Sequence, residues 1–211
     1  MNAITSYAHI KHNTVTVNGT VVFKSASSVS IHEFLLESYK FLAMNYPKFH
    51  KMDVQCKLAI IATEFALRET ALLTENDLAK IAIVFSNHAS SLDTDKAYQN
   101  SISDKSNYFP SPAIFVYTLP NITIGELAIR HKITGENAFF VCEKFDPALL
   151  INYCESLYLN GIDAVIAGWV EAETNNDEAF IFLSESQRNT NKNAIFKPLN
   201  QTTLTELYNL T

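Results

Sequence analysis

Three cysteines and six histidines are the side chains of this sequence that could act as nucleophiles or general bases. Cys56, Cys142 and Cys154 are an odd number at unrelated spacings in apolar surroundings. The sequence therefore predicts free thiols, and neither a disulfide framework nor a zinc site. Each histidine is expected to be solvated or to cap a helix rather than to act as a base: His9, His12, His32, His50, His88 and His131. We expect no metal and no cofactor.

Cys142 lies at the end of a short apolar run, just before the start of a helix. Asp146 and Pro147 are typical of a helix N-cap and first position. Without further information, Cys142 is a small apolar residue at the end of a strand. Four elements are predicted around it: a helix over residues 120–132, a strand over 138–142, a helix over 148–159 and a strand over 164–170.

The residues along this stretch, 111–171, resemble the amino-terminal half of β-ketoacyl synthases, the condensing enzymes of fatty acid and polyketide synthesis. The resemblance is carried by Thr118, Pro120-Asn121, Gly125, Ala128-Ile129-Arg130, Gly135, Gly161, Asp163, Ala164-Val165-Ile166-Ala167-Gly168 and Glu171. Two outlying segments add to it, Lys51-Met52-Asp53 and residues 81–92. Together they cover most of residues 45–172.

The resemblance implies a degenerate active site. In ketosynthases a cysteine lies at the start of the buried helix, where the helix N-terminus stabilises the thiolate. Counting back from Gly161, that position falls on Lys144, and an ammonium there is no thioester-forming nucleophile. Cys142 would take the place only if a small gap shifted the segment. The family's catalytic histidines belong to a second half that this sequence does not match, so we expect no catalytic residues.

Among condensing enzymes, the sequence looks most like chain length factors, which lack the nucleophile and pair with an active ketosynthase. It is similar in particular to the short ketosynthase-like proteins of aryl polyene and flexirubin clusters. The implied partner is a full-length β-ketoacyl synthase, with acyl carrier protein involved only indirectly. Two alternatives stay open. The first is an active acyltransferase, whose site either uses Cys142 or is completed by a partner. The second is a homodimeric acyl-binding protein.

The resemblance also places an acyl tunnel and a dimer interface. It puts them in the loop over residues 88–98, in a strand before the helix at Pro120, and near the strand 138–142. The residues expected there are Phe109, Phe115, Tyr117, Asn121, Phe139 and Phe140, and each aromatic ring could equally be a core residue.

Composition and the flanking segments complete the prediction. The 211 residues are 47% hydrophobic and 18% charged, which suits one domain over residues 1–211. The net charge of -6 argues against nucleic acid, and the absence of a leader or a long apolar run predicts a cytoplasmic protein that does not enter the membrane. The flanking elements are predicted as a hairpin over 14–23, helices over 31–45 and from Asp53, a strand over 81–85, a loop over 86–112 with a short helix near 93–100, a strand over 178–184, a polar mobile segment over 187–193 and a helix over 203–210.

These elements predict an α/β fold: a mixed, mainly parallel sheet with helices on both faces, equivalent to half of a thiolase-like fold. A lone half would expose a broad apolar surface of a kind that soluble monomers rarely tolerate. The sequence therefore predicts a heterodimer with a ketosynthase, or a homodimer.

Overall fold

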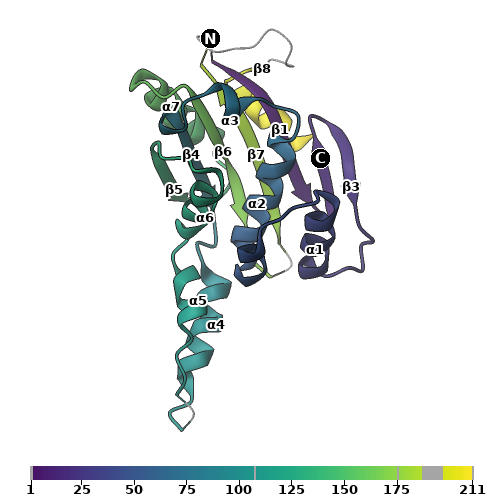
Figure 1. Ribbon diagram of the computed structural model, residues 1–211, viewed down its shortest axis with the longest axis vertical. Coiled ribbons are helices and arrows are strands. Elements are labelled where there is room, and N and C mark those ends of the chain that lie inside the picture. Colours follow the sequence, from purple (N-terminus) through teal and green to yellow (C-terminus); the bar gives the residue numbers. More distant parts are fainter. Residues whose placement is uncertain (1, 107, 175, 187–196, 211) are drawn as a thin grey trace.

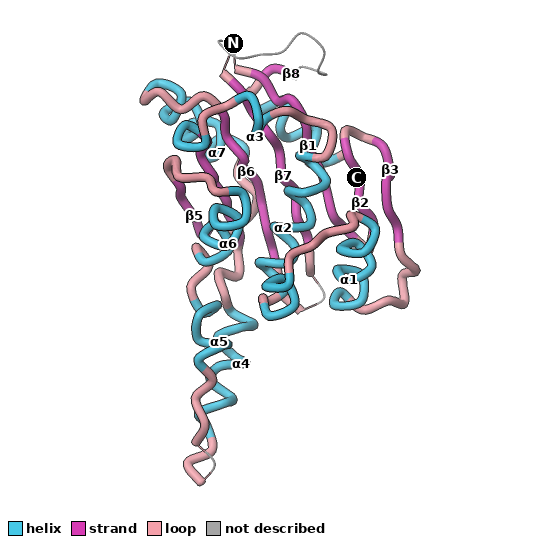
Figure 2. Tube along the Cα trace, viewed as in Figure 1, coloured by secondary structure: helices cyan, strands magenta, loops and turns pink. Residues whose placement is uncertain are grey.

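The backbone is organised around one eight-stranded sheet with helices on both faces, as Figures 1 and 2 show. The computed structural model describes residues 2–106, 108–174, 176–186 and 197–210. Seven strands follow the order β3-β2-β1-β7-β6-β4-β5, and β8 pairs with one end of β1. The strands are β1 (Ala3–Lys11), β2 (Thr14–Val17), β3 (Thr20–Lys24), β4 (Ile81–Asn87), β5 (Asn137–Val141), β6 (Ala164–Glu171), β7 (Glu178–Glu185) and β8 (Lys197–Pro198).

The sheet is mixed, as predicted, but the prediction that it is mainly parallel is wrong. Only β4 runs parallel to its neighbours, β5 and β6, and every other pairing is antiparallel. The short turns between β1, β2 and β3 and between β6 and β7 explain this, because a tight turn can join only antiparallel strands. The sequence analysis also missed β1, which lies between β2 and β7 in the sheet.

The helices divide into two layers. Over one face lie α1 (Ile31–Phe41), α2 (Val54–Leu67) and α6 (Ile122–His131), whose buried side chains meet Ile81, Ile83 and Phe85 of β4. Over the other face lie α7 (Pro147–Leu159) and α8 (Gln201–Asn209), which meet Ala82 and Val84. The remaining helices are α3 (Leu72–Glu75), α4 (Leu92–Ser103), α5 (Pro112–Phe115) and the 3-10 helices Pro47–Lys51, Leu78–Lys80 and Val116–Thr118.

Most predicted element boundaries are close to those observed. The exception among the helices is α1, which ends at Phe41 rather than near residue 45, because Ala43 adopts a positive φ of 50°. The predicted polar segment 187–193 lies outside the described residues. No single helix in the described chain is long and apolar enough to cross a membrane. The segments Pro112–Thr118 and Ile122–His131, bent by 100°, meet that length and composition only when taken together.

Helices α4 and α5 form an arm that projects beyond the end of the sheet (Figure 1). The arm is defined here as α4, α5 and the described residues between them. Sequence analysis predicted a strand around Phe109 and Phe115, but Phe115 lies in a helix and Phe109 lies in no regular element. Ser111 accepts the N–H of Ile114 at 3.4 Å, and Pro112 occupies the first turn. These two residues favour the start of a helix here.

The C-terminal helix α8 is tied to the sheet by a buried carboxylate, Glu178. Glu178 Oε1 lies 2.7 Å from His9 Nε2 and 3.1 Å from Lys11 Nζ, and Tyr208 of α8 donates its hydroxyl to Oε2 at 2.8 Å. Burial alone would raise the pKa of Glu178, but these partners lower it to about 2. His9 is only 1% exposed, so the expectation that it is solvated is wrong, because β1 runs through the middle of the sheet.

Replacing Glu178 with glutamine is expected to lower the free energy of unfolding by about 2 to 3 kcal/mol at pH 7. The native pKa lies below the ordinary value of 4.5, so this stabilisation is present above pH 4.5 and is lost as the pH falls towards 2. Urea unfolding of wild type and variant at pH 7 and pH 3 measures the difference. Glu206→Gln, on an exposed position of α8, is the control. An equal difference at both pH values would contradict the assigned role.

Candidate functional site

The junction between β5 and α7 is where the resemblance places a nucleophile. Asp146 accepts the N–H of Leu149 at 3.0 Å and Pro147 follows it, so the helix begins as the sequence predicted. Lys144 lies in the loop just before this cap and is exposed. A lysine at this position carries no thiol and so cannot form the thioester through which a ketosynthase works.

Cys142 lies at the end of β5, where its N–H donates to the carbonyl oxygen of Asn87 at 2.7 Å. Burial, and to a smaller extent the negative charge of Asp146, raise the pKa of the Cys142 thiol. A cysteine nucleophile needs a lowered pKa and a neighbouring base. The environment of Cys142 therefore disfavours the thiolate.

An aromatic cluster fills the space beside this junction. The ring of Phe145 stacks on Tyr208 of α8, with centroids 4.1 Å apart, and contacts Phe180 edge to face at 5.6 Å. Trp169 of β6 completes the cluster, 6.4 Å from Phe145. Helix α8 thus packs against one side of this junction. Sequence analysis missed Tyr208, whose only signal was its place on an amphipathic helix.

A buried carboxylate organises the loop that leads from β4 into the arm. Glu171 is 1% exposed and accepts the backbone N–H groups of His88 at 2.7 Å and Ala89 at 3.2 Å. Burial raises the pKa of Glu171, and the two N–H donors oppose that rise. Ser91, at the start of α4, donates its hydroxyl to the carbonyl oxygen of Thr118 at 2.7 Å. These contacts fix the base of the arm on both sides, in the segment that enters α4 and in the segment that follows α5.

The structure divides the predicted tunnel and interface residues into an exposed group and a core group. Phe109 and Phe115 are 78% and 57% exposed on the arm, and Phe115 contacts Tyr98 of α4 at 5.2 Å between centroids. Tyr117 is 8% exposed, and its hydroxyl donates to Glu126 at 3.3 Å. Asn121, at the start of α6, is exposed.

Phe139 and Phe140 of β5 lie on opposite faces of the sheet. Phe139 packs against the core under α2 and α6, whereas Phe140 packs under α7 and meets Tyr153 at 5.1 Å. The structure therefore does not bring the six predicted residues together in one tunnel. Six large apolar side chains on and near the arm are exposed: Leu92, Tyr108, Phe109, Phe115, Val116 and Leu119.

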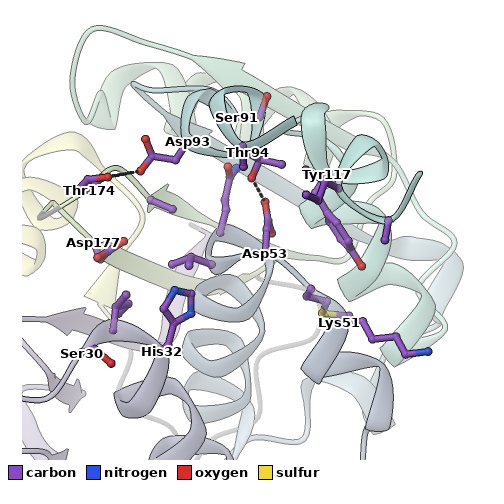
Figure 3. A pocket seen from close by; sticks show the side chains of 18 of the residues that line it. Ser30, His32, Lys51, Asp53, Ser91, Asp93, Thr94, Tyr117, Thr174 and Asp177 are labelled. Atoms are coloured by element: carbon purple, nitrogen blue, oxygen red, sulfur yellow. Dashed lines mark hydrogen bonds between the residues drawn. The ribbon is translucent and has the colours of Figure 1, made fainter. Parts of the chain in front are cut away.

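A pocket of about 740 Å³ opens at the base of the arm (Figure 3). Tyr117 and Ile114 line it on one side, and the first residues of α1 and α2 line it on the others. Neither Cys142 nor Lys144 belongs to it. Among the described residues, no group of three or more histidine, cysteine, aspartate or glutamate side chains could hold a metal ion.

Comparison with protein-family models gave no match for this sequence, and comparison with curated proteins gave none either. Solved structures do match. A chain of the ishigamide ketosynthase/chain length factor aligns with a TM-score of 0.65 and 15% identity, over 90% of this chain and 63% of that one. The chain has a ketosynthase-like fold. The thiolase-like fold predicted from the sequence is thereby confirmed.

Two further structures have the same fold. One is the ketosynthase ApeO in complex with its chain length factor ApeC from Xenorhabdus doucetiae, with a TM-score of 0.55 and 16% identity over 88% of this chain and 79% of that one. The other is AntDE:AntF, a type II polyketide synthase acyl carrier protein in complex with its ketosynthase, with a TM-score of 0.62 and 14% identity over 92% and 65%. This chain spans 63% to 79% of the chains that it matches.

The chemistry of the junction leads to a prediction about the thiol. Because the pKa of Cys142 is raised, incubation with a ketosynthase-directed epoxide inhibitor is expected to leave Cys142 unlabelled, and the protein should not decarboxylate malonyl carrier protein. Intact-mass measurement after incubation checks the labelling. Lys144→Cys alone should also remain without synthase activity. Stoichiometric labelling of Cys142 in the wild type would contradict this prediction.

Proposed function

We propose that this chain is a non-catalytic, chain-length-factor-type subunit that pairs with an active β-ketoacyl carrier protein synthase in polyene or fatty-acid-like biosynthesis. The observation that carries the proposal is a ketosynthase-like fold with Lys144, rather than a thiol, in the loop just before the N-cap of α7. The stacking of Phe145 on Tyr208 beside this junction supports it, since the two rings occupy space next to Lys144.

The surface that supports a ketosynthase partner consists of the arm and the free edge of β5. Val141 of β5 is 58% exposed, and β5 pairs only with β4 among the described strands. Phe109 and Phe115 add exposed aromatic rings on the arm. Side chains of this kind dominate the energetics of obligate interfaces, and an unpaired strand edge is a ready template for another chain. Acyl carrier protein would meet this subunit only through the partner.

Co-expression with candidate full-length ketosynthases, followed by native mass measurement, tests the proposal. A stable 1:1 complex is expected with the cognate ketosynthase, and a homodimer or a poorly soluble protein without it. A well-behaved monomer at micromolar concentration that binds no ketosynthase would overturn the proposed pairing. A homodimer that persists beside the ketosynthase would favour a homodimeric acyl-binding protein. On this proposal the complex works in the cytoplasm, where acyl carrier protein is available.

In the assembled complex, Phe115→Ala is expected to shift the product distribution towards longer chains. Removing an exposed ring opens space on the order of tens of cubic ångströms at the partner's tunnel end while costing little folding stability. Tyr117→Ala is expected to give the same shift, but with a stability loss of about 3 kcal/mol, because Tyr117 is buried and paired with Glu126.

Mass spectrometry of the products measures the shift. The control is Leu159→Ala, an exposed apolar position on α7 far along the chain from the arm, which should leave the product distribution unchanged. If the complex with folded Phe115→Ala made an unchanged distribution of products, this subunit would not set chain length. Its role would then be to stabilise the ketosynthase.

A further inference from the structure

Tyr117 lies between the pocket at the base of the arm and a buried carboxylate. Its ring lines the pocket together with Ile114, and Figure 3 shows its hydroxyl directed away from Asp93 and Asp177 on the opposite side. The hydroxyl donates to Oε1 of Glu126 at 3.3 Å, and Glu126 itself does not line the pocket. The ring is therefore a wall of the pocket that is held from behind.

Glu126 is held in turn by a lysine from another segment. The carboxylate is 4% exposed, and its Oε2 lies 2.6 Å from Nζ of Lys48 in the 3-10 helix Pro47–Lys51. The side chain of Lys48 is 45% exposed, so it reaches the buried carboxylate from the surface. The hydrogen bond to Glu126 raises the pKa of Lys48, whose ammonium therefore stays charged. No other ion pair to Glu126 is found in the described part of the chain.

These contacts make the position of the Tyr117 ring depend on one surface charge. A carboxylate with so little exposure is costly unless a cation pairs with it. Without the ammonium of Lys48, Glu126 would have to take up a proton or move. Either change weakens the acceptor that Tyr117 uses, because hydrogen bonds to a charged acceptor are the stronger kind. The ring would then be held by packing alone.

The place of Tyr117 in the chain gives its position further importance. It belongs to the 3-10 helix Val116–Thr118, directly after α5, and the carbonyl oxygen of Thr118 accepts the hydroxyl of Ser91. Burial and, to a smaller extent, the negative charge of Glu126 raise the pKa of Tyr117, so the phenol stays protonated and remains a donor. The contact with Glu126 therefore fixes both the pocket wall and the segment where the arm rejoins the domain.

We propose that Glu126 and Lys48 are positioning residues for Tyr117, and that they thereby fix how much of the pocket is open to the apolar end of a growing chain. This inference rests on the proposed chain-length role and adds to it two residues that the growing chain does not touch. Val54, Ala97 and Ile114 give the pocket of about 740 Å³ apolar surface suited to such a chain. A fixed wall gives a narrow product distribution, and a mobile wall admits longer chains.

Lys48→Met in the assembled complex is the decisive variant, because it removes the charge, keeps an apolar side chain and lies at the surface, where it should not prevent folding. It is expected to raise the ratio of longer to shorter products about threefold, and Tyr117→Ala about tenfold, since one methylene in a pocket changes discrimination by roughly 10- to 200-fold. Lys48→Arg, which keeps a charge for Glu126, should retain the wild-type ratio. The matched control is Lys40→Met, on an exposed position of α1 for which the described residues provide no ion pair.

A double variant separates positioning from a purely structural effect. Tyr117→Phe has no hydroxyl to hold, so adding Lys48→Met to it should leave the product ratio unchanged. An equally large shift from Lys48→Met in both backgrounds would overturn the positioning role. A shift from Tyr117→Ala without one from Lys48→Met would also overturn it, while leaving the proposed chain-length role intact. An unchanged ratio from Tyr117→Ala would remove both.

Fluorine NMR of the complex containing 3-fluorotyrosine follows the ring without reference to the products. The signal of Tyr117 is the one that is lost in Tyr117→Phe. Lys48→Met should move or broaden this signal, and Lys40→Met should leave it in place. A Tyr117 signal that Lys48→Met does not change would overturn the inference, whatever products the complex makes.

Discussion

Gly168→Ala is expected to prevent this chain from folding to a soluble product. Gly168 lies within β6, between β4 and β7, and a Cβ atom there would be 2.0 Å from the carbonyl oxygen of Phe180 and 3.0 Å from the Cα of Ile181. Both neighbours are backbone atoms of a central strand and cannot move aside without separating β6 from β7. We expect a loss of more than about 4 kcal/mol, a large part of the roughly 5 to 15 kcal/mol by which folded domains are stable. Soluble yield and near-ultraviolet circular dichroism measure the outcome.

Gly125→Ala provides the matched control for this substitution. Gly125 lies in α6, and a Cβ atom there would meet nothing within 4 Å. Alanine favours a helix over glycine by up to about 1 kcal/mol, so the variant should be as stable as the wild type or more stable. Normal folding of Gly168→Ala, or equal damage from both substitutions, would show that the packing between β6 and β7 is looser than the structure indicates.

Glu171→Ala is expected to have the second large effect, on the arm as well as on stability. The side chain is 1% exposed and accepts the N–H groups of His88 and Ala89, so its removal takes the acceptor away from two partly buried backbone donors. The expected loss is about 3 kcal/mol, since charge-assisted hydrogen bonds are the stronger kind. Because the loop at His88 leads directly into α4, the arm should lose its fixed orientation, and complex formation with a ketosynthase should weaken at least tenfold.

Glu173→Ala is the control, because Glu173 lies two residues further along and no hydrogen bond to its side chain is found in the described chain. Urea unfolding measures the stability of both variants, and hydrogen exchange over residues 88–103 reports the order of the loop and α4. If Glu171→Ala lost stability without added exchange in α4, the carboxylate would stabilise the core but would not position the arm.

Local chemistry explains what could be predicted from the sequence. The turn at Asn18-Gly19, with φ of 50° and 84°, and the cap at Asp146 are fixed by neighbouring residues, and both were correctly predicted. Strand β1 was missed because eight of its nine residues are buried, so the alternation that marks a strand with one exposed face is absent. The segment near Phe115 was predicted as a strand from the family resemblance, but Ser111 and Pro112 make it helical.

The candidate site was less predictable because its contacts are long-range. Lys144 could be located by counting along one short stretch of sequence. The stacking of Phe145 on Tyr208 joins positions 63 residues apart, and the pocket joins α1, α2, α4 and the turn before β7. Neither periodicity nor composition carries information about which distant segments meet. Only the fold brings Asp93 and Asp177 to one opening.

The two outer strands of the sheet, β3 and β5, each offer an edge to which another molecule could add. Both β3 and β5 have one unpaired edge among the described strands, and both expose valines, Val21 on β3 and Val141 on β5. If β3 of one molecule paired with β5 of the next, each addition would leave the same two edges free, and the product would be an open filament. A subunit bound on β5 removes one of the two edges that such growth requires. A ketosynthase bound at β5 would therefore also block filament growth. When this chain is in excess over the ketosynthase, we expect fibrous aggregates rather than unfolded protein.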